Sequence, residues 1–189
     1  SLLLEKLTDN FNNFINSDID TVIELIGGSD PAKDYVISAL NSGKNVVTAN
    51  KEIIASSIEE LTSVANSNKV KIRFEAAVGA GIPLVGVLID MLKQNNISKI
   101  TGIINGTSNY ILSTMDKENK SFKEVLQNAK ELGYAESNPT SDLNGEDVAS
   151  KLKILSSLCF NSFLNKNIHV EGIKDVDKDD IDYANRLGY

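Results

Sequence analysis

Asp147 and Lys151 are the two side chains in this sequence best placed to perform chemistry. They lie four positions apart near the expected start of a helix, so they share one helix face. A lysine that is partly removed from water and paired with a carboxylate can be tuned for proton transfer. The same spacing also fits an ordinary surface ion pair, which contributes about 0.2–0.5 kcal/mol. The pair therefore indicates acid–base chemistry if its helix face borders a cleft.

Two further candidates follow expected strands. Lys51 comes after an apolar strand, at the carboxyl end where open parallel sheets bind ligands, and it could meet a phosphate, a carboxylate or a developing negative charge. The small, glycine-rich segment 75–83 could approach a ligand closely, or its carbonyls could bind a hard cation beside Glu75. The alternatives are a solvated lysine at a helix start and a tight strand-to-helix turn.

The segment 102–109 also precedes an expected helix. Backbone N–H groups and hydroxyls gather there, which suits a carboxylate ligand. The alternative is simple capping of the helix by Ser108 or Asn109.

Composition excludes several classes of function. The net charge of −7, from 19 Lys and Arg against 26 Asp and Glu, disfavours nucleic-acid binding by phosphate neutralisation. The sequence contains no run of 18 apolar residues, so we expect no membrane span.

A single cysteine, Cys159, rules out an internal disulfide framework and fits a reducing, cytosolic setting; we expect it to be buried and unreactive. His169 is the only histidine, and we expect it on a strand without catalytic duty. Proton chemistry must therefore come from Lys, Asp, Glu or Tyr.

The first half of the chain alternates strand and helix patterns. We expect strands at 21–26, 45–48 and 70–74, with one helix capped by Asp30 and a second helix after Lys51. This β-α-β-α-β order predicts parallel strands with right-handed crossovers, half of a dinucleotide-binding fold. No Gly-x-Gly-x-x-Gly turn occurs, so we expect the chain to be the later part of a longer protein, or to lack an N-terminal segment.

The second half has a different pattern. A capping box at Ser121 and Glu124 opens one of its helices, which closes at Gly133. The expected elements are a helix at 84–92, a strand at 97–104, a loop at 105–109, helices at 110–115 and 121–133, a turn-rich loop at 136–144, a helix at 145–160, a strand at 168–173 and a helix at 178–187.

Two motifs in this half, taken with the segments before them, resemble the homoserine dehydrogenase family. They are Asn-Gly-Thr-Ser-Asn-Tyr at 105–110 and Gly-Tyr-Ala-Glu…Asp…Gly-x-Asp-x-x-x-Lys at 133–151. The resemblance runs from about residue 20 to 189 and includes the segments 20–28, 43–52, 74–83, 102–112 and 133–155. It implies an α/β fold: a partial Rossmann-like parallel sheet followed by an α+β substrate-binding and dimerisation domain. The implied domains are 1–75, the C-terminal part of an NAD(P)-binding domain, and 76–189, the catalytic and substrate domain.

The activity that the resemblance implies is the NAD(P)-dependent interconversion of L-homoserine and L-aspartate 4-semialdehyde. This step leads toward threonine, methionine and isoleucine. The resemblance also implies a homodimer that acts on a small-molecule substrate. The composition predicts a cytoplasmic protein with no nucleic-acid or membrane partner. In dinucleotide-binding folds, the residue that contacts the ribose 2′ group and distinguishes NAD from NADP follows the second strand. We expect that strand to lie outside this sequence, so both cofactors stay open.

The resemblance also assigns roles by position. Lys151 would be the acid/base that gives the carbonyl oxygen its proton, with Asp147 positioning it, and Glu136 would hold the substrate ammonium group. The other substrate contacts would be Asp142, Tyr134, Gly106, Thr107 and Lys51. The cofactor would be contacted by Ile26, Gly27, Thr48, Ala49 and Lys51. A monovalent cation, sodium, would be held by Glu75 and by the carbonyls of Val78, Ala80 and Ile82.

Two other functions fit the same residues. One is a different Rossmann-type amino-acid dehydrogenase that also uses a Lys/Asp pair. The other is a catalytically incompetent dimerisation module. Because the glycine-rich turn is absent, we expect the 189-residue chain alone to bind dinucleotide weakly and to turn over negligibly.

Overall fold

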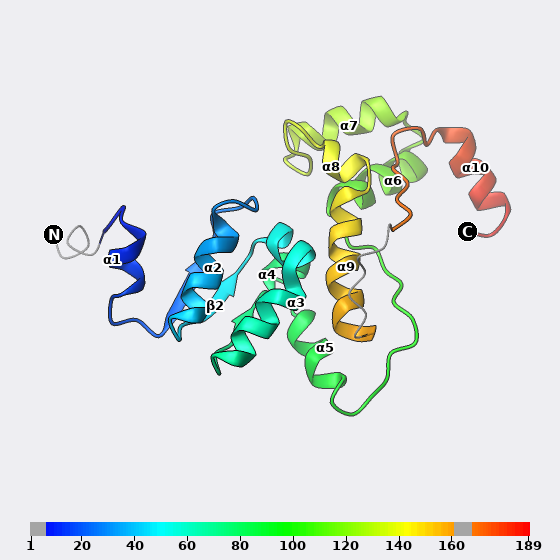
Figure 1. The fold of residues 1–189 in the computed structure, drawn as a ribbon. Helices are drawn as coiled ribbons and strands as arrows, with labels where there is room; N and C mark the ends of the chain where they lie inside the picture. The colour runs from blue at the N-terminus through cyan, green and yellow to red at the C-terminus, as the bar shows by residue number, and fades with distance from the viewer. Residues whose placement is uncertain (1–6, 161–167) are drawn as a thin grey trace. The chain divides into compact units, whose positions relative to one another are not determined.

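The computed structural model describes residues 7–160 and 168–189 (Figure 1). Of these, 7–96 and 154–160 form one compact unit, and 97–153 and 168–189 form a second. These units follow spatial contacts, so the expected domains 1–75 and 76–189 stay a prediction.

A small parallel sheet organises the first unit. Its strands are β1 (Thr21–Glu24), β2 (Asn45–Thr48) and β3 (Ile72–Arg73), in the spatial order β1-β2-β3. Both strand pairs are parallel, which confirms the predicted β-α-β-α-β order. β1 is shorter than expected because the backbone N–H of Ile26 turns back to donate to the Glu24 carboxylate, at 2.7 Å.

Helices α2 (Ala32–Asn41) and α3 (Lys51–Ser67) connect these strands and pack against each other (Figure 1). Their apolar faces, which include Leu40 and Leu61, are fully buried. The expected capping of α2 by Asp30 is wrong: Pro31 takes the cap position, and no side chain bonds to the first turn. The unit's other separate helices are α1 (Phe11–Ile15), α4 (Ala76–Gly79) and α5 (Val85–Met91).

The second unit is built from helices and loops in its described residues. Ser121 and Glu124 form the predicted capping box, and Gly133 follows the helix with a φ of 79°. The helices are α6 (Gly106–Glu118), α7 (Phe122–Glu131), α8 (Thr140–Leu143), α9 (Glu146–Phe160) through its residues 146–153, and α10 (Lys178–Arg186). α6 contacts α7, α8 and α10. The core consists of Ile111, Met115, Val125, Ala129, Ala135 and Leu143.

Two predicted strands of this half are wrong. The segments 97–104 and 168–173 are extended or irregular, without strand pairing. Ile103 is 78% exposed, so its β-branched side chain does not pack into a buried sheet. The apolar pattern alone suggested a strand, but a strand also needs a partner for its backbone groups.

The start of α6 also differs from expectation. The helix begins at Gly106, inside the segment predicted as a loop, because Asn105 is the N-cap and its side chain accepts from the N–H of Ser108. The suggested caps, Ser108 and Asn109, lie within the helix.

Across residues 7–160 and 168–189, no helix has both the length and the apolar character needed to cross a membrane.

Candidate active site

Lys151 and Asp147 form a short, sheltered ion pair on the first turns of α9. Lys151 Nζ lies 2.8 Å from Asp147 Oδ2, and the two side chains are only 17% and 10% exposed. Nζ also donates to the carbonyl oxygen of Ile104, at 2.8 Å. A pair this far removed from water is not an ordinary surface pair, and its lysine is held by two acceptors in a defined position.

Asn105 and Asp142 complete this cluster. The Asn105 amide nitrogen donates to Asp142 Oδ1 at 2.8 Å and to Asp147 Oδ2 at 3.0 Å. Asp142 lies on the short helix α8, so residues from α8, α9 and the start of α6 meet here. Sequence reasoning included Ile104 and Asn105 in the candidate segment 102–109 but assigned neither residue a role of its own. The available signal was the strong N-cap preference of asparagine directly before an expected helix.

A second group of predicted substrate residues lies at the start of α6 and after α7. The Thr107 hydroxyl donates to the carbonyl oxygen of Tyr134 at 2.8 Å, and Thr107 is 8% exposed. The ring of Tyr134 stacks on Tyr110 with a centroid distance of 4.4 Å, while 56% of Tyr134 stays exposed. Gly106 and Glu136 are both exposed, Glu136 in the loop between α7 and α8. Their substrate roles stay predictions.

In the first unit, a buried polar network joins the carboxyl ends of β1 and β2. The Thr48 hydroxyl donates to the carboxylate of Glu24, and Thr48 in turn accepts from the N–H of Asn50 at 2.9 Å. The Asn50 amide donates to the carbonyl of Gly28 at 2.7 Å. Glu24, Thr48 and Asn50 are at most 6% exposed. The network ties the loop after β1 to the start of α3; sequence reasoning missed Glu24 and Asn50.

The predicted cofactor residues lie at this same sheet edge. Ile26 is 56% exposed, and Gly27 has a φ of 78° with nothing within 4 Å of where a Cβ would be, so a ligand can approach its backbone. Ala49 is half-buried, and Lys51 is the first residue of α3. The Thr48 side chain is committed to Glu24, so any contact of Thr48 with a cofactor would use its backbone.

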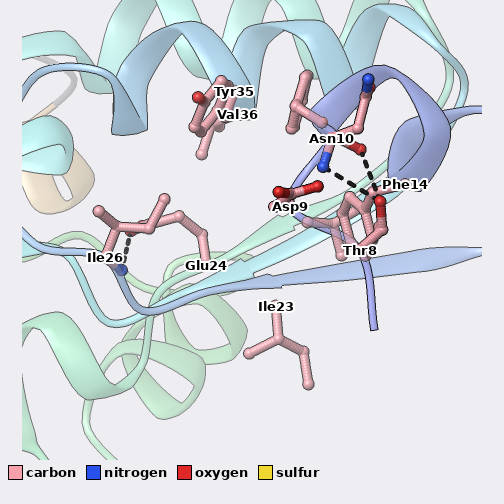
Figure 2. A pocket seen from close by; sticks show the side chains of 11 residues that line it. Thr8, Asp9, Asn10, Phe14, Ile23, Glu24, Ile26, Tyr35 and Val36 are labelled. Atoms are coloured by element: carbon pink, nitrogen blue, oxygen red, sulfur yellow. Dashed lines mark hydrogen bonds between the residues drawn. The ribbon is translucent and has the colours of Figure 1, made fainter. Parts of the chain in front are cut away.

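A cavity of about 260 Å³ lies beside β1, between α1 and α2 (Figure 2). Phe11 stacks on Tyr35 there with a centroid distance of 4.1 Å. The lining residues are Thr8, Asp9, Asn10, Phe11, Phe14, Val22, Ile23, Glu24, Ile26, Tyr35 and Val36. Its aromatic and aliphatic walls suit apolar side chains rather than phosphates, so we place no catalytic group there.

Glu75 has a structural role that the sequence did not reveal. Its carboxylate accepts the N–H groups of Leu84 at 2.6 Å, Val85 at 2.7 Å and Gly86 at 2.8 Å, and so caps α5 from a distance. Burial by itself would raise the pKa of the Glu75 carboxyl, but these three donors outweigh it and lower the pKa below its usual value.

We expect Glu75→Gln to destabilise the protein by about 1–2 kcal/mol at neutral pH, because the charge-assisted bonds to three backbone N–H groups at the start of α5 are lost. A glutamate with a depressed folded-state pKa stabilises above its unfolded value, near 4.3, and loses this contribution as pH falls through the folded-state pKa. Urea unfolding at several pH values would therefore show the gap between wild type and variant closing below about pH 4. The exposed Glu59→Gln on α3 is the matched control, and a gap independent of pH would contradict the assignment.

Cys159 and His169 are the two other potentially reactive side chains that the sequence analysis considered. Cys159 is 8% exposed on α9, and burial raises the pKa of its thiol, which agrees with an unreactive cysteine. His169 lies outside any strand. Within the described parts of the chain, no three His, Cys, Asp or Glu side chains gather into a metal site.

The parallel sheet of the first unit has the strand order of a dinucleotide-binding α/β fold, and the second unit holds a sheltered Lys–Asp pair. Comparison with known proteins identifies the family. A family model described as homoserine dehydrogenase matches residues 83–189. A second, described as the NAD-binding domain of homoserine dehydrogenase, matches residues 2–75. The chain therefore belongs to the homoserine dehydrogenase family.

Relatives and solved structures show the same likeness. A homoserine dehydrogenase of Neisseria gonorrhoeae is 44% identical over 96% of this chain and 42% of its own length. The crystal structure of a homoserine dehydrogenase from Thiobacillus denitrificans matches with a TM-score of 0.90 and 44% identity, over 97% of this chain and 43% of that one. A hyperthermophilic archaeal homoserine dehydrogenase mutant in complex with NADPH matches with a TM-score of 0.80 and 29% identity, over 90% of this chain and 53% of that one. The chain thus spans less than half the length of the first two.

Proposed function

We propose that the protein carrying this chain interconverts L-homoserine and L-aspartate 4-semialdehyde with NAD or NADP, a step toward threonine, methionine and isoleucine. The observation that carries the proposal is the sheltered pair of Lys151 and Asp147, in a chain that both family models match. This reaction needs an acid/base beside a carbonyl, and Lys151 is held in a defined position for that role.

The proton chemistry follows from the charge on Lys151. When bound, the nicotinamide ring supplies a hydride to the aldehyde carbon or accepts one from the alcohol carbon. During reduction, negative charge develops on the aldehyde oxygen, and the Lys151 ammonium stabilises this oxygen and gives it a proton. In the reverse direction, neutral Lys151 takes the proton of the hydroxyl group. Asp147 holds Nζ in place through the ion pair at 2.8 Å.

We propose that the amino-acid part of the substrate is bound by the polar groups around α6 and α8. Glu136 would pair with the substrate ammonium group, and its exposure leaves the carboxylate accessible. The Thr107 hydroxyl is committed to the Tyr134 carbonyl, so this bond would shape the pocket and the backbone at Gly106 would supply donors. Asp142 completes the proposed set of substrate contacts in this unit.

The residues at the sheet edge fit a dinucleotide. The open backbone at Gly27, exposed Ile26, half-buried Ala49 and Lys51 at the start of α3 all lie at the carboxyl ends of parallel strands, where such folds bind cofactors. One relative was solved with NADPH, which supports a nicotinamide cofactor for this chain.

We also propose a sodium ion at the turn 75–82. The carbonyl oxygens of Val78, Ala80 and Ile82 are hard ligands of the kind that alkali cations accept, and Ala80 turns the chain sharply with a φ of 51°. The Glu75 carboxylate is committed to α5, so the ion would be held by backbone oxygens with this negative charge nearby.

A cytoplasmic homodimer is the expected setting. The resemblance supports the dimer, and the single buried cysteine suits a reducing compartment.

The test is a chimeric protein in which this chain is joined to the N-terminal and C-terminal segments of the Neisseria gonorrhoeae relative. The chimera is assayed with homoserine as the substrate. We expect NAD(P)-dependent oxidation in which deuterium at C4 of homoserine appears on the nicotinamide ring. No turnover of homoserine would overturn the proposal, and turnover of a different amino-acid substrate would favour another dehydrogenase. The 189-residue chain alone is the control, and calorimetry should find it binding NADPH more weakly than micromolar.

A further inference from the structure

We propose that Asn105 is a positioning residue of the active site, which aligns Asp147, and through it Lys151, for proton transfer. This inference rests on the proposed function. It extends that function to a residue that contacts neither substrate nor cofactor in the mechanism above.

The orientation of the Asn105 amide is fixed by its two ends. Its Oδ1 accepts the backbone N–H of Ser108 at 2.8 Å, as the N-cap of α6. Its Nδ2 therefore faces the two carboxylates of Asp142 and Asp147. The reverse orientation would place an oxygen against two carboxylates and an NH₂ against an N–H group, so the geometry permits one arrangement.

The amide uses both of its hydrogens on these carboxylates. It bridges two like charges from α8 and α9, at 2.8 Å and 3.0 Å, and so offsets their repulsion. Asn105 is 6% exposed and Asp147 is 7% exposed, so water gives little screening at this point.

Asn105 and Lys151 share one oxygen atom. Asp147 Oδ2 accepts from the Asn105 amide at 3.0 Å and from Lys151 Nζ at 2.8 Å. Nζ also donates to the carbonyl of Ile104, the residue directly before Asn105. The carbonyl of Ile104 therefore holds Lys151, and the side chain of the next residue, Asn105, holds Asp147. Because both contacts come from adjacent residues, a change at Asn105 should alter the position of Nζ.

Asn105 also caps a helix, and the two roles can be separated by substitution. Asn105→Ser keeps an N-cap oxygen, but its hydroxyl is too short to bridge the two carboxylates. Asn105→Asp keeps both the cap and the shape, but it replaces the NH₂ donor with an acceptor. Asn128→Ser, on α7 in the same unit, is the matched control.

In the chain completed with the relative's flanks, we expect Asn105→Ser and Asn105→Asp to lower kcat by about 10–100-fold, the scale of a misplaced catalytic group. KM for homoserine should change less than about threefold. Asn128→Ser should keep wild-type kcat. Retention of at least half the wild-type kcat by both Asn105 variants would overturn the proposal.

A double-mutant cycle tests whether Asn105 acts through Asp147. In an Asp147→Asn background, Asn105→Ser should lower kcat by less than about threefold, because the group it aligns is already altered. Full additivity of the two losses would contradict the proposal and leave Asn105 a helix cap only.

A second measurement needs no activity and separates this proposal from the proposed function. The side-chain NH₂ resonances of Asn105 should exchange slowly with solvent, and they should shift in the Asp147→Asn variant. Fast exchange and no shift would overturn the proposal even in an active enzyme. Slow exchange in a protein that does not oxidise homoserine would reject the proposed function alone.

Discussion

Lys151→Ala should depress the turnover of homoserine by about 10²–10⁴-fold in the completed chain, the usual range for a lost general acid or base. The variant removes both the proton donor and the positive charge that stabilises the developing alkoxide. The loss should appear in kcat and kcat/KM alike, because the interaction is made in the transition state. Steady-state kinetics in both directions would measure it.

Folding controls separate this loss from unfolding. Removing Lys151 leaves the Asp147 carboxylate sheltered but still bonded to Asn105, so we expect a stability loss of about 1–3 kcal/mol rather than collapse. Lys123→Ala, an exposed lysine on α7, should change neither rate nor stability measurably. A Lys151→Ala enzyme that is folded and as fast as wild type would remove Lys151 from the mechanism.

The ion pair could be predicted because it is a local feature. Asp147 and Lys151 are one helical turn apart, and helix geometry alone brings them together. The capping box at Ser121 and the parallel order of β1, β2 and β3 were predictable for the same reason: short patterns with few alternatives specify them.

The rest of the site depends on contacts between residues far apart in the sequence. Asn105 meets Asp142 and Asp147 across separations of 37 and 42 residues, and Lys151 meets Ile104 across 47. These contacts arise from the path of the segment before α6, which the sequence pattern wrongly predicted as a strand. The low solvent exposure of the Asp147–Lys151 pair could not be predicted either, since the i,i+4 spacing is the same at the surface and in a sheltered site.

The turn that leads into α9 is closely packed against a segment that follows it in the chain. A Cβ on Gly172 would lie 2.5 Å from the carbonyl oxygen of Leu143 and 3.0 Å from Asn144 Cα. The N–H of Ile173 donates to the same Leu143 oxygen at 2.9 Å. Gly145, with a φ of 83°, marks a second close approach, since a Cβ added there would lie 3.0 Å from the carbonyl oxygen of Glu171. The start of the helix that carries Asp147 and Lys151 is therefore braced by backbone that admits no side chain at residue 172.

Gly172→Ala should consequently destabilise the protein by about 2–4 kcal/mol, because the clash is with backbone atoms that cannot rotate away. The expected fall in Tm is about 5–15 °C for a chain of this size, measured by circular dichroism. Gly102→Ala is the matched control: Gly102 lies in the same unit with nothing within 4 Å of the added Cβ, so its Tm should stay within about 2 °C. Hydrogen exchange should localise the Gly172→Ala effect to α8 and the first turn of α9. Equal Tm values for the two variants would show that residues 170–173 do not brace this turn.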